Sequence, residues 1–324
     1  MHVKTLCSGA SLWFALVSSA FAEQPAEQWL KRLQTAQATQ SYQGAFVYER
    51  KGAFTTHQVW RQVNSKGEML ERFVQLNGPE HEVMRVDGQV VCMSSTVAGA
   101  LDVVDIWPAE TFNMQHLQEW YEVIVLGESR VAGHMATVLL FSPRDQHRYP
   151  VEIYVDQASD IPLKTLLLNE QGQLLERLQF VQFQAGVDSQ AAGAQLKASA
   201  ECQPVTQTQN NIDTDEIDVD WAVGWTPPGF LLLKSHYKKS ADSGNYVLSQ
   251  VYSDGLASFS VFFEDIGTLE VESGRRQLGP TAVASRKVVR DTERLMVTVV
   301  GEIPLGTAER IALSMHTGQE QSND

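Results

Sequence analysis

Apolar and polar residues alternate along much of the chain, and the alternation is framed by helical patterns near both ends. Residues 23–38 place Trp29, Leu30 and Leu33 on one face of a predicted helix. Alternating segments follow, and turns such as Lys51-Gly52 and Asp87-Gly88 separate them. Turns this short join antiparallel neighbours. The predicted strands of this run are residues 43–50, 56–63, 68–76, 81–86, 89–94, 121–132, 135–142, 147–155, 163–169 and 173–183.

Helical spacing returns in the middle of this run, between residues 96 and 119. Consecutive hairpins build one large antiparallel sheet, and a twisted sheet of that size has to curl or close. We therefore expect a large curved antiparallel sheet wrapped on helices. Its concave face would either be filled by the helical segment or be open to a ligand.

The last third of the chain predicts a smaller α+β domain. Its expected strands are residues 230–237, 246–252, 257–264, 281–289 and 294–301, and a helix is expected at 307–315. Thr307 is the predicted N-cap of that helix. After the Asp254-Gly255 turn, one face of the 257–264 strand carries two phenylalanines and a valine and is expected to be core. The alternate residues Ser258, Ser260 and Phe262 would remain for a partner.

Charge and composition divide the chain further. Residues 203–220 contain five acids and no Lys or Arg, which is typical of a linker. This linker separates a domain at residues 23–202 from one at 221–324. The whole chain of 324 residues has 39 acidic and 25 basic side chains, and its net charge of -14 argues against a nucleic-acid partner.

The N-terminus has the pattern of a secretory signal peptide over residues 1–22. Lys4 supplies the positive start, and the apolar stretch of residues 6–17 is too short to span a bilayer. Ala20 and Ala22 are the small residues that a signal peptidase requires. We therefore expect the mature protein to be soluble in an oxidising exported compartment, most simply the periplasm.

Removal of the signal peptide leaves two cysteines, Cys92 and Cys202. In an oxidising compartment they predict a disulfide. Closing a loop of this length would stabilise the fold by roughly 4–5 kcal/mol in the loop-entropy description. Two buried free thiols are the alternative, whereas no Cys-x-x-Cys motif points to a redox role.

Signatures of enzymes and of metal sites are weak. His81-Glu82 begins like a zinc-protease helix, but Arg85 stands where the second His ligand is required. Asp145 and His147 could form an acid and base pair or ligate a metal, although an ion-paired surface loop is commoner. The acids of the linker lack the spacing of a calcium loop. We therefore expect no catalytic residue, no metal and no cofactor.

Large apolar side chains are concentrated on the predicted strands. Core packing explains them, and lining of a lipid-accommodating hollow is the functional alternative. The residues concerned are Phe46, Tyr48, Trp60 and Phe73, with Leu76 and Tyr154 nearby in the pattern.

Several short motifs, taken together and in order, resemble the MucB/RseB family of periplasmic sigma-factor regulators. They lie at residues 44–50, 143–149, 163–177, 225–230, 252–256 and 299–304, and so run through nearly the whole predicted mature chain. The paired cysteines are most similar to the pseudomonad branch of the family. Nothing in the acidic linker resembles the family.

The resemblance implies an N-terminal half-open β-barrel, similar to lipoprotein carriers, followed by a smaller C-terminal domain. It also implies a non-enzymatic regulator that binds the periplasmic domain of a transmembrane anti-sigma factor and shields it from proteolysis. Lipid or lipopolysaccharide binding would be the release signal. Expected contacts in the C-terminal domain, which the resemblance links to binding, are Trp225, Phe230, Lys238, Phe262 and Arg286.

Two other classes of function stay open at this point. The same hollow would serve a soluble periplasmic carrier of lipid or lipoprotein, and a periplasmic hydrolase is the third hypothesis. The sequence also leaves the oligomeric state open, a homo-oligomer included.

Overall fold

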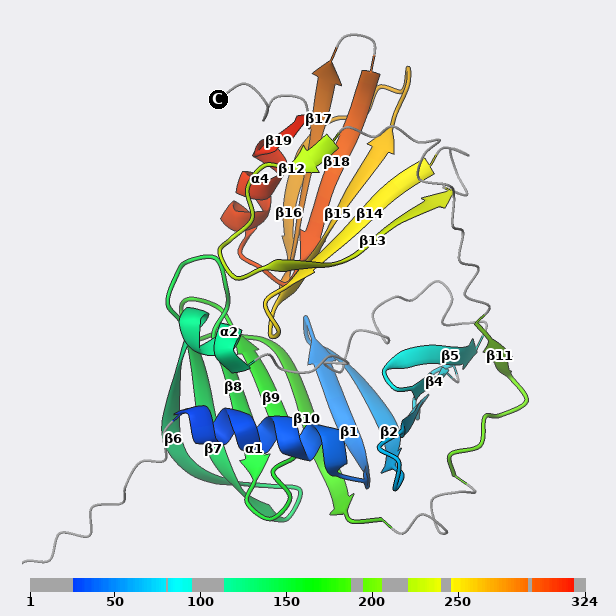
Figure 1. Ribbon diagram of the computed structural model, residues 1–324, viewed down its shortest axis with the longest axis vertical. Coiled ribbons are helices and arrows are strands. Elements are labelled where there is room, and N and C mark those ends of the chain that lie inside the picture. The colour runs from blue at the N-terminus through cyan, green and yellow to red at the C-terminus, as the bar shows by residue number, and fades with distance from the viewer. Residues whose placement is uncertain are drawn as a thin grey trace, which may run out of the picture.

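The computed structural model describes residues 26–79, 81–94, 114–187, 195–205, 221–239, 246–290 and 293–317. The predicted signal peptide, the helical pattern at 96–113 and the linker from residue 206 to 220 lie outside these ranges. In the described residues, two antiparallel sheets of eleven and six strands lie one above the other, and helices pack on both (Figure 1). The predicted α+β class with a large open sheet is confirmed.

The larger sheet consists of two meanders joined along one seam. Its strands are β1 (Tyr42–Arg50), β2 (Ala53–Val63), β3 (Met69–Gln75), β4 (Glu82–Val86), β5 (Gln89–Ser94), β6 (Tyr121–Val131), β7 (His134–Pro143), β8 (Val151–Asp156), β9 (Pro162–Leu168), β10 (Leu174–Ala185) and β11 (Cys202–Pro204). Their order is β11-β5-β4-β3-β2-β1-β10-β9-β8-β7-β6. β1 pairs with β10 at the seam, and β6 and β11 are the two ends of the sheet. We call the part of the molecule built on this sheet the N-terminal domain.

Helix α1 (Ala26–Thr39) lies across the larger sheet (Figure 1). Its buried Trp29, Leu30 and Leu33 pack with side chains of the short helix α2 (Met114–Trp120) and of strands β6 to β8. Ala36, one turn later, packs with a second cluster that includes Tyr42 and Phe180. The amphipathic pattern at the start of the chain thus places this helix against the concave face of the sheet.

The smaller sheet has the order β13-β14-β15-β18-β17-β16. Its strands are β13 (Leu231–Lys239), β14 (Tyr246–Ser253), β15 (Ser258–Asp265), β16 (Gly274–Leu278), β17 (Thr281–Arg290) and β18 (Glu293–Gly301). Helix α4 (Leu305–Leu313) covers one face, and β12 (Trp221–Val223) pairs with β19 (Met315–Thr317). We call this part the C-terminal domain.

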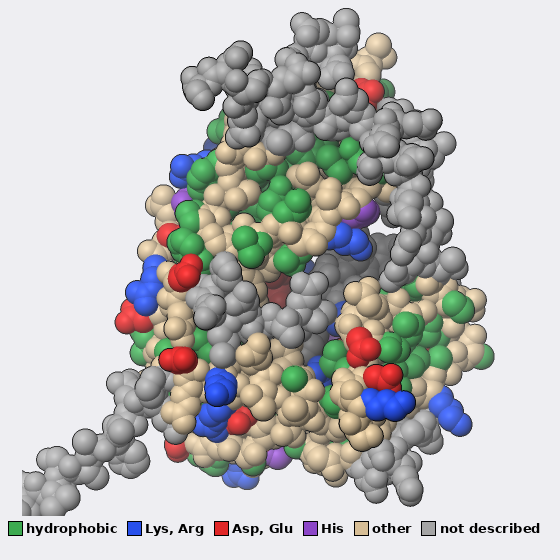
Figure 2. Space-filling view, viewed as in Figure 1, with side chains coloured by type: hydrophobic (Ala, Val, Ile, Leu, Met, Phe, Trp, Pro, Cys, Tyr) green, Lys and Arg blue, Asp and Glu red, His purple; other side chains and the backbone are tan. Residues whose placement is uncertain are grey.

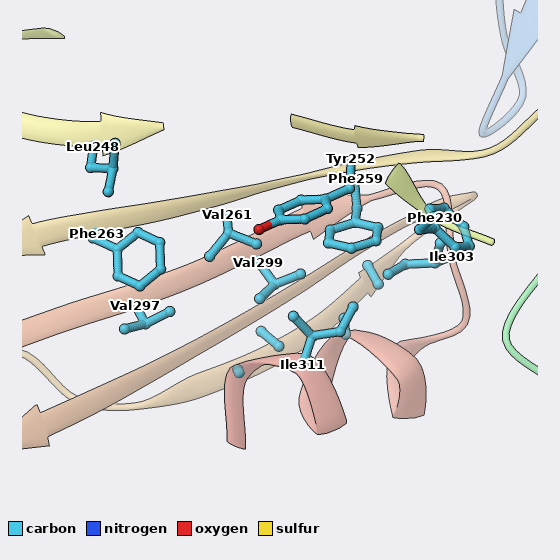
Figure 3. Close-up of a cluster of buried hydrophobic side chains, with 14 of the residues drawn as sticks. Phe230, Leu248, Tyr252, Phe259, Val261, Phe263, Val297, Val299, Ile303 and Ile311 are labelled. Atoms are coloured by element: carbon cyan, nitrogen blue, oxygen red, sulfur yellow. The ribbon is translucent and has the colours of Figure 1, made fainter. Parts of the chain in front are cut away.

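The core of the C-terminal domain lies between α4 and the sheet (Figure 3). Phe259, Val261 and Phe263 are buried there with Val297, Val299 and Ile311, as the alternation along the 257–264 strand predicts. Their neighbours Ser260 and Phe262 lie on the opposite face of β15, which no helix of the described chain covers.

Several details differ from the sequence prediction. Gln203 and Pro204, expected at the start of the linker, belong to β11 and pair with β5. The strand expected at 147–155 begins only at Val151, because residues 147–150 belong to a loop that contacts the C-terminal domain. Thr307 is not the N-cap of α4: Pro304 is, and the Thr307 side chain is buried inside the first turns. The strand β16, with the sequence Gly-Arg-Arg-Gln-Leu, was not expected because it shows no apolar alternation. No helix among the described residues has the length and apolarity needed to cross a membrane.

Candidate partner-binding site

The junction between the two domains is organised around Arg148. This arginine follows β7 in the loop before β8, and its side chain is fully buried. Its Nε donates to Asp254 Oδ2 at 2.6 Å, and its other nitrogens donate to the Asp145 carboxylate and the Pro228 carbonyl. Asp254 and Pro228 belong to the C-terminal domain, so one guanidinium group ties the two domains together.

Aromatic side chains enclose this ion pair. The Tyr121 hydroxyl donates to the same Asp254 oxygen at 3.0 Å, and the Arg148 guanidinium carbon lies 5.1 Å from the Trp120 ring centroid and 5.0 Å from that of Phe230. Burial, followed by the Asp254 charge, raises the pKa of Tyr121 well above its ordinary value. The phenol therefore remains a neutral donor throughout the physiological pH range.

Two glycines allow the domains to approach this closely. Gly229 has a φ of +89°, and a Cβ there would overlap the Trp120 indole ring. Gly255 has a φ of +99° in the β14–β15 turn, and a Cβ there would lie 3.7 Å from Leu117, an ordinary van der Waals contact, so the φ alone favours glycine at this position. The adjacent Leu256 packs into the N-terminal core around α1 and α2. The Asp-Gly turn predicted from the sequence thus also packs against the core of the other domain.

A second polar contact lies at the hairpin between β1 and β2. Arg50 donates to the Thr281 hydroxyl and to Glu302 Oε1, the latter at 3.3 Å, and its Nε lies 3.7 Å from Glu176. Thr281 begins β17, which lies next to the edge strand β16, so this contact lies toward the edge of the smaller sheet opposite β13. The two domains are therefore joined at two separated places, which fixes their angle as well as their distance.

His147 and Trp225 form a third part of the junction. Their ring centroids lie 5.1 Å apart, and the Arg310 guanidinium carbon lies 3.8 Å from the Trp225 ring. His147 Nδ1 is 3.0 Å from the Thr307 hydroxyl, whereas Asp145 pairs with Arg148. Burial lowers the pKa of His147, so the ring is neutral at pH 7. The side chains of Asp145 and His147 have separate partners and do not form an acid and base pair.

The predicted hollow residues fall into two groups. Phe46, Tyr48 and Phe73 are buried in one cluster with Tyr42 and Phe180. Trp60 lies on the other face of β2, since it alternates with the buried Val59, and it stacks against Arg72. Tyr154 packs at the edge of the cluster, and Leu76 is exposed. The structure thus brings three of the four candidates together on the concave side.

The same concave face carries buried charges that alternation alone did not reveal. Arg61 and Glu71 are paired at 2.8 Å, and Arg85 lies beside Glu71 on the next strand; all three are at most 4% exposed. His57 stacks on Phe46, and burial, followed by the charge of His81, lowers its pKa to about 4. The feature of the sequence that indicates these buried charges is the presence of polar residues at inward positions of β2 to β4.

The outer face of β3 to β5 is covered by residues 195–205. Cys92 and Cys202 form a disulfide with a Cα–Cα distance of 5.5 Å, as predicted. Glu82 accepts hydrogen bonds from Arg72 and from both the backbone and the hydroxyl of Ser199. Burial would raise the pKa of Glu82, but these hydrogen bonds outweigh it and lower the pKa below its ordinary value. The His81-Glu82 motif therefore has a structural role in a strand, and no cluster of metal ligands occurs in the described part of the chain.

The five expected contact residues lie in different environments. Trp225 belongs to the junction, and Phe230 is only 5% exposed in the C-terminal core, so it is not available to a partner in this arrangement. Arg286 donates to the Leu313 carbonyl at the end of α4. Phe262 is half-buried on the helix-free face of the sheet, and Lys238 lies in β13, the strand at one edge. Only the last two occupy a continuous region, formed by β13 and the helix-free face.

Family models match both domains. The model described as "MucB/RseB N-terminal domain" matches residues 25–200, and the one described as "MucB/RseB C-terminal domain" matches residues 215–316. The chain is 48% identical over 290 residues to the sigma factor AlgU regulatory protein MucB of Pseudomonas aeruginosa, which covers 90% of each protein. It is 25% identical to the sigma-E factor regulatory protein RseB of Escherichia coli, over 96% of this chain and 99% of the relative.

Solved structures agree with these sequence relatives. The chain resembles a protein in the complex of Pseudomonas aeruginosa MucA and MucB with a TM-score of 0.79 and 47% identity, over 90% of this chain and 98% of that one. A crystal structure of MucB alone gives a TM-score of 0.70 and 45% identity, over 91% of this chain and 99% of that one. The relatives are therefore similar in both domains and across the junction.

Proposed function

The chain belongs to the MucB/RseB family, and from this membership we propose that it binds the periplasmic domain of a transmembrane anti-sigma factor of the MucA/RseA type. Binding shields that domain from regulated proteolysis and so keeps the sigma factor inactive. The observation that carries the proposal is the similarity, across nearly the whole chain, to a MucB whose structure was solved in complex with the periplasmic part of MucA.

The chemistry of the described residues supports a binding role without catalysis. Asp145 and His147 each have another partner, Arg148 and Thr307. Glu82 accepts hydrogen bonds from Arg72 and Ser199. His57, whose pKa is strongly lowered, is buried beside Phe46. The relatives are named as regulatory proteins. The disulfide and the predicted signal peptide support export, and we propose the periplasm as the site of action.

The test combines binding with protection. The protein without residues 1–22 is mixed with the purified periplasmic domain of the anti-sigma factor, and the complex is isolated by size exclusion. The protease that makes the first regulatory cut in the anti-sigma factor is then added at increasing concentrations of the protein under study. We expect cleavage to slow in proportion to the fraction bound, and unchanged cleavage at saturation would contradict the proposal.

We further propose that lipid or lipopolysaccharide binding in the N-terminal domain releases the partner. The buried aromatic cluster of Phe46, Tyr48 and Phe73 on the concave face supports this, because apolar side chains are what an acyl chain requires. Lipid added to the preformed complex should restore cleavage. A soluble lipid or lipoprotein carrier is the second candidate, and it is removed if delipidated protein neither takes up lipid nor transfers it.

A further inference from the structure

β13 is an edge strand with an apolar start. In the described residues it pairs with β14 on one side, and no strand pairs with it on the other. Its first residues, Leu231, Leu232 and Leu233, are 50%, 50% and 48% exposed. Free edges present unpaired backbone groups and are normally protected by charges, by short length or by cover. Three consecutive exposed leucines give the start of β13 no charge of this kind, and the first lysine comes only at position 234.

The other edge of the same sheet provides the contrast. β16 has only five residues, two of which are arginines, and Arg275 is paired with Glu309 at 2.6 Å. In the N-terminal domain, the edge strand β6 is interrupted by an irregularity between Val125 and Gly127. β13 also has an irregularity, between Leu232 and Lys234, but from Lys234 to Lys239 it pairs with β14 residue by residue. A regular stretch of edge is therefore available directly after the leucines.

The chemistry of β13 selects the kind of partner. Its sequence, Leu-Leu-Leu-Lys-Ser-His-Tyr-Lys-Lys, has three lysines and no acid, in a chain whose net charge is -14. Lys234 and His236 point to the helix-free face, because they pair with Val251 and Ser249 across the ladder while the core side chains Leu248 and Tyr252 alternate with these. Apolar, basic and hydrogen-bonding groups thus follow one another along a single edge.

The position of β13 favours a partner that also meets the N-terminal domain. The strand borders the C-terminal domain on the side that faces the larger sheet (Figure 1), and hydrophobic side chains gather on the visible surface of the C-terminal domain (Figure 2). Its first residue directly follows Phe230, whose ring lies against the Arg148 guanidinium. The edge is therefore continuous with the junction described above.

We propose that the free edge of β13 binds an extended segment of the anti-sigma factor's periplasmic domain as an added β-strand. Backbone pairing would run along the regular stretch from Lys234 to Lys239, apolar side chains of the segment would contact Leu231 to Leu233, and acidic ones would lie near Lys234. This inference rests on the proposed function and assigns its contact surface.

Hydrogen exchange of the wild-type protein is the primary test. Amides of β13 should exchange more slowly when the periplasmic domain of the anti-sigma factor is bound, whereas those of β6 and β16 should not change. Binding without slower exchange in β13 overturns the edge proposal and leaves the proposed function intact. Absence of binding overturns both. Slower exchange in β13 that depends on the concentration of the free protein would assign the edge to a second copy of the chain and also overturn the proposal.

Substitutions supply the second test. Combined replacement of Leu231, Leu232 and Leu233 by Ser should weaken the complex at least about tenfold, because the apolar contact is lost. Lys234→Glu should lower the affinity more at low salt than at high salt, since it reverses a charge that would face an acidic segment. The matched control is Arg276→Ser on the other edge, which should leave the affinity unchanged. Equal affinity of the triple variant and the wild type would contradict the proposal.

Discussion

Arg148 and Asp254 carry opposite charges in a place that water does not reach, and each comes from a different domain. Such a pair adds little net stability while intact, because desolvation of both ions offsets their attraction. The Tyr121 hydroxyl and the Pro228 carbonyl complete the hydrogen bonding of the two ions. Loss of Arg148 would leave Asp254 buried without a counter-charge, and loss of Asp254 would leave Arg148 with only the partly exposed Asp145 carboxylate. The pair therefore acts mainly by selecting one fit of the two domains.

Replacement of Asp254 by Asn should therefore be costly even though the shape of the side chain is kept. We expect the free energy of unfolding to fall by about 3–5 kcal/mol, measured by urea denaturation at pH 7. The control is Arg275→Gln, which removes a solvent-exposed ion pair with Glu309 and should cost less than about 1 kcal/mol. Similar small losses for both variants would show that Asp145 alone is a sufficient counter-charge for the buried Arg148.

His57 makes the stability of the N-terminal domain depend on pH. Burial lowers its pKa from an ordinary 6.5 to about 4, so between these values the unfolded chain binds a proton that the folded chain does not. Stability should then fall as the pH drops through this window, by about 2 kcal/mol at pH 5 from this residue. His57→Gln should lose less stability than the wild type between pH 7.5 and 5, measured by urea denaturation. Parallel curves for the two proteins would argue against a neutral, buried His57.

At the scale of the elements, two turns do more than reverse the chain. The β14–β15 turn inserts Leu256 into the core of the other domain, and the Pro227–Phe230 turn places Gly229 against the Trp120 ring. Both turns contain a glycine with positive φ, a conformation that other residues adopt only with strain. At Gly229 the approach of the two domains also depends on the absence of a side chain, whereas at Gly255 only the positive φ requires glycine.

A matched pair of glycines separates strain from contact. Gly229 and Gly133 have nearly the same φ, +89° and +88°, but nothing lies near a Cβ at Gly133. Gly133→Ala should cost about 1–2 kcal/mol from the left-handed backbone alone. Gly229→Ala should cost about 1–3 kcal/mol more, because the methyl group overlaps Trp120. Thermal unfolding of the two variants measures the difference, and equal losses would mean that the turn moves away from the indole without penalty.

Local patterns were sufficient for most elements but not for the junction. Alternation predicted the meanders, because an inward residue such as Leu178 and its outward neighbours Arg177 and Gln179 differ in polarity. It could not identify Arg148, which lies in a segment expected to be strand, nor Asp254, whose Asp-Gly context predicts only a turn. Phe230 was expected as a partner contact, with core packing as the alternative, and it lies in the core, because its neighbours in space are distant in sequence. Export and two remaining cysteines, by contrast, left only one pairing to predict, and the disulfide is present.

At the scale of the whole molecule, two separated contacts hold the domains at a fixed angle. One is centred on Arg148 and the other on Arg50, which reaches Thr281 and Glu302. A single contact would permit rotation in every direction. Two contacts leave only rotation about the line between them, which the His147–Thr307 contact opposes. A partner that meets both domains would thus encounter a preorganised surface and lose less conformational entropy on binding.

This coupling predicts how the protein unfolds. Scanning calorimetry of the wild type should give one cooperative transition, since the folded junction stabilises both domains. Combined replacement of Arg148 and Arg50 by Ala should split it into two transitions, one for each sheet. Two transitions in the wild type would indicate that the junction contributes little to either domain.

Under the export to the periplasm proposed above, the seam between β1 and β10 bears on the order in which the strands of the sheet can pair. Strands β1 to β5 can pair as neighbours while the rest of the chain is still crossing the inner membrane, and so can β6 to β10 among themselves. Tyr42, however, has to wait for Ala185, its partner in the register. Until that residue is translocated, β1 lacks its partner strand β10 and presents an unpaired edge. The first meander therefore stays prone to aggregation until the last strand of the second has been translocated.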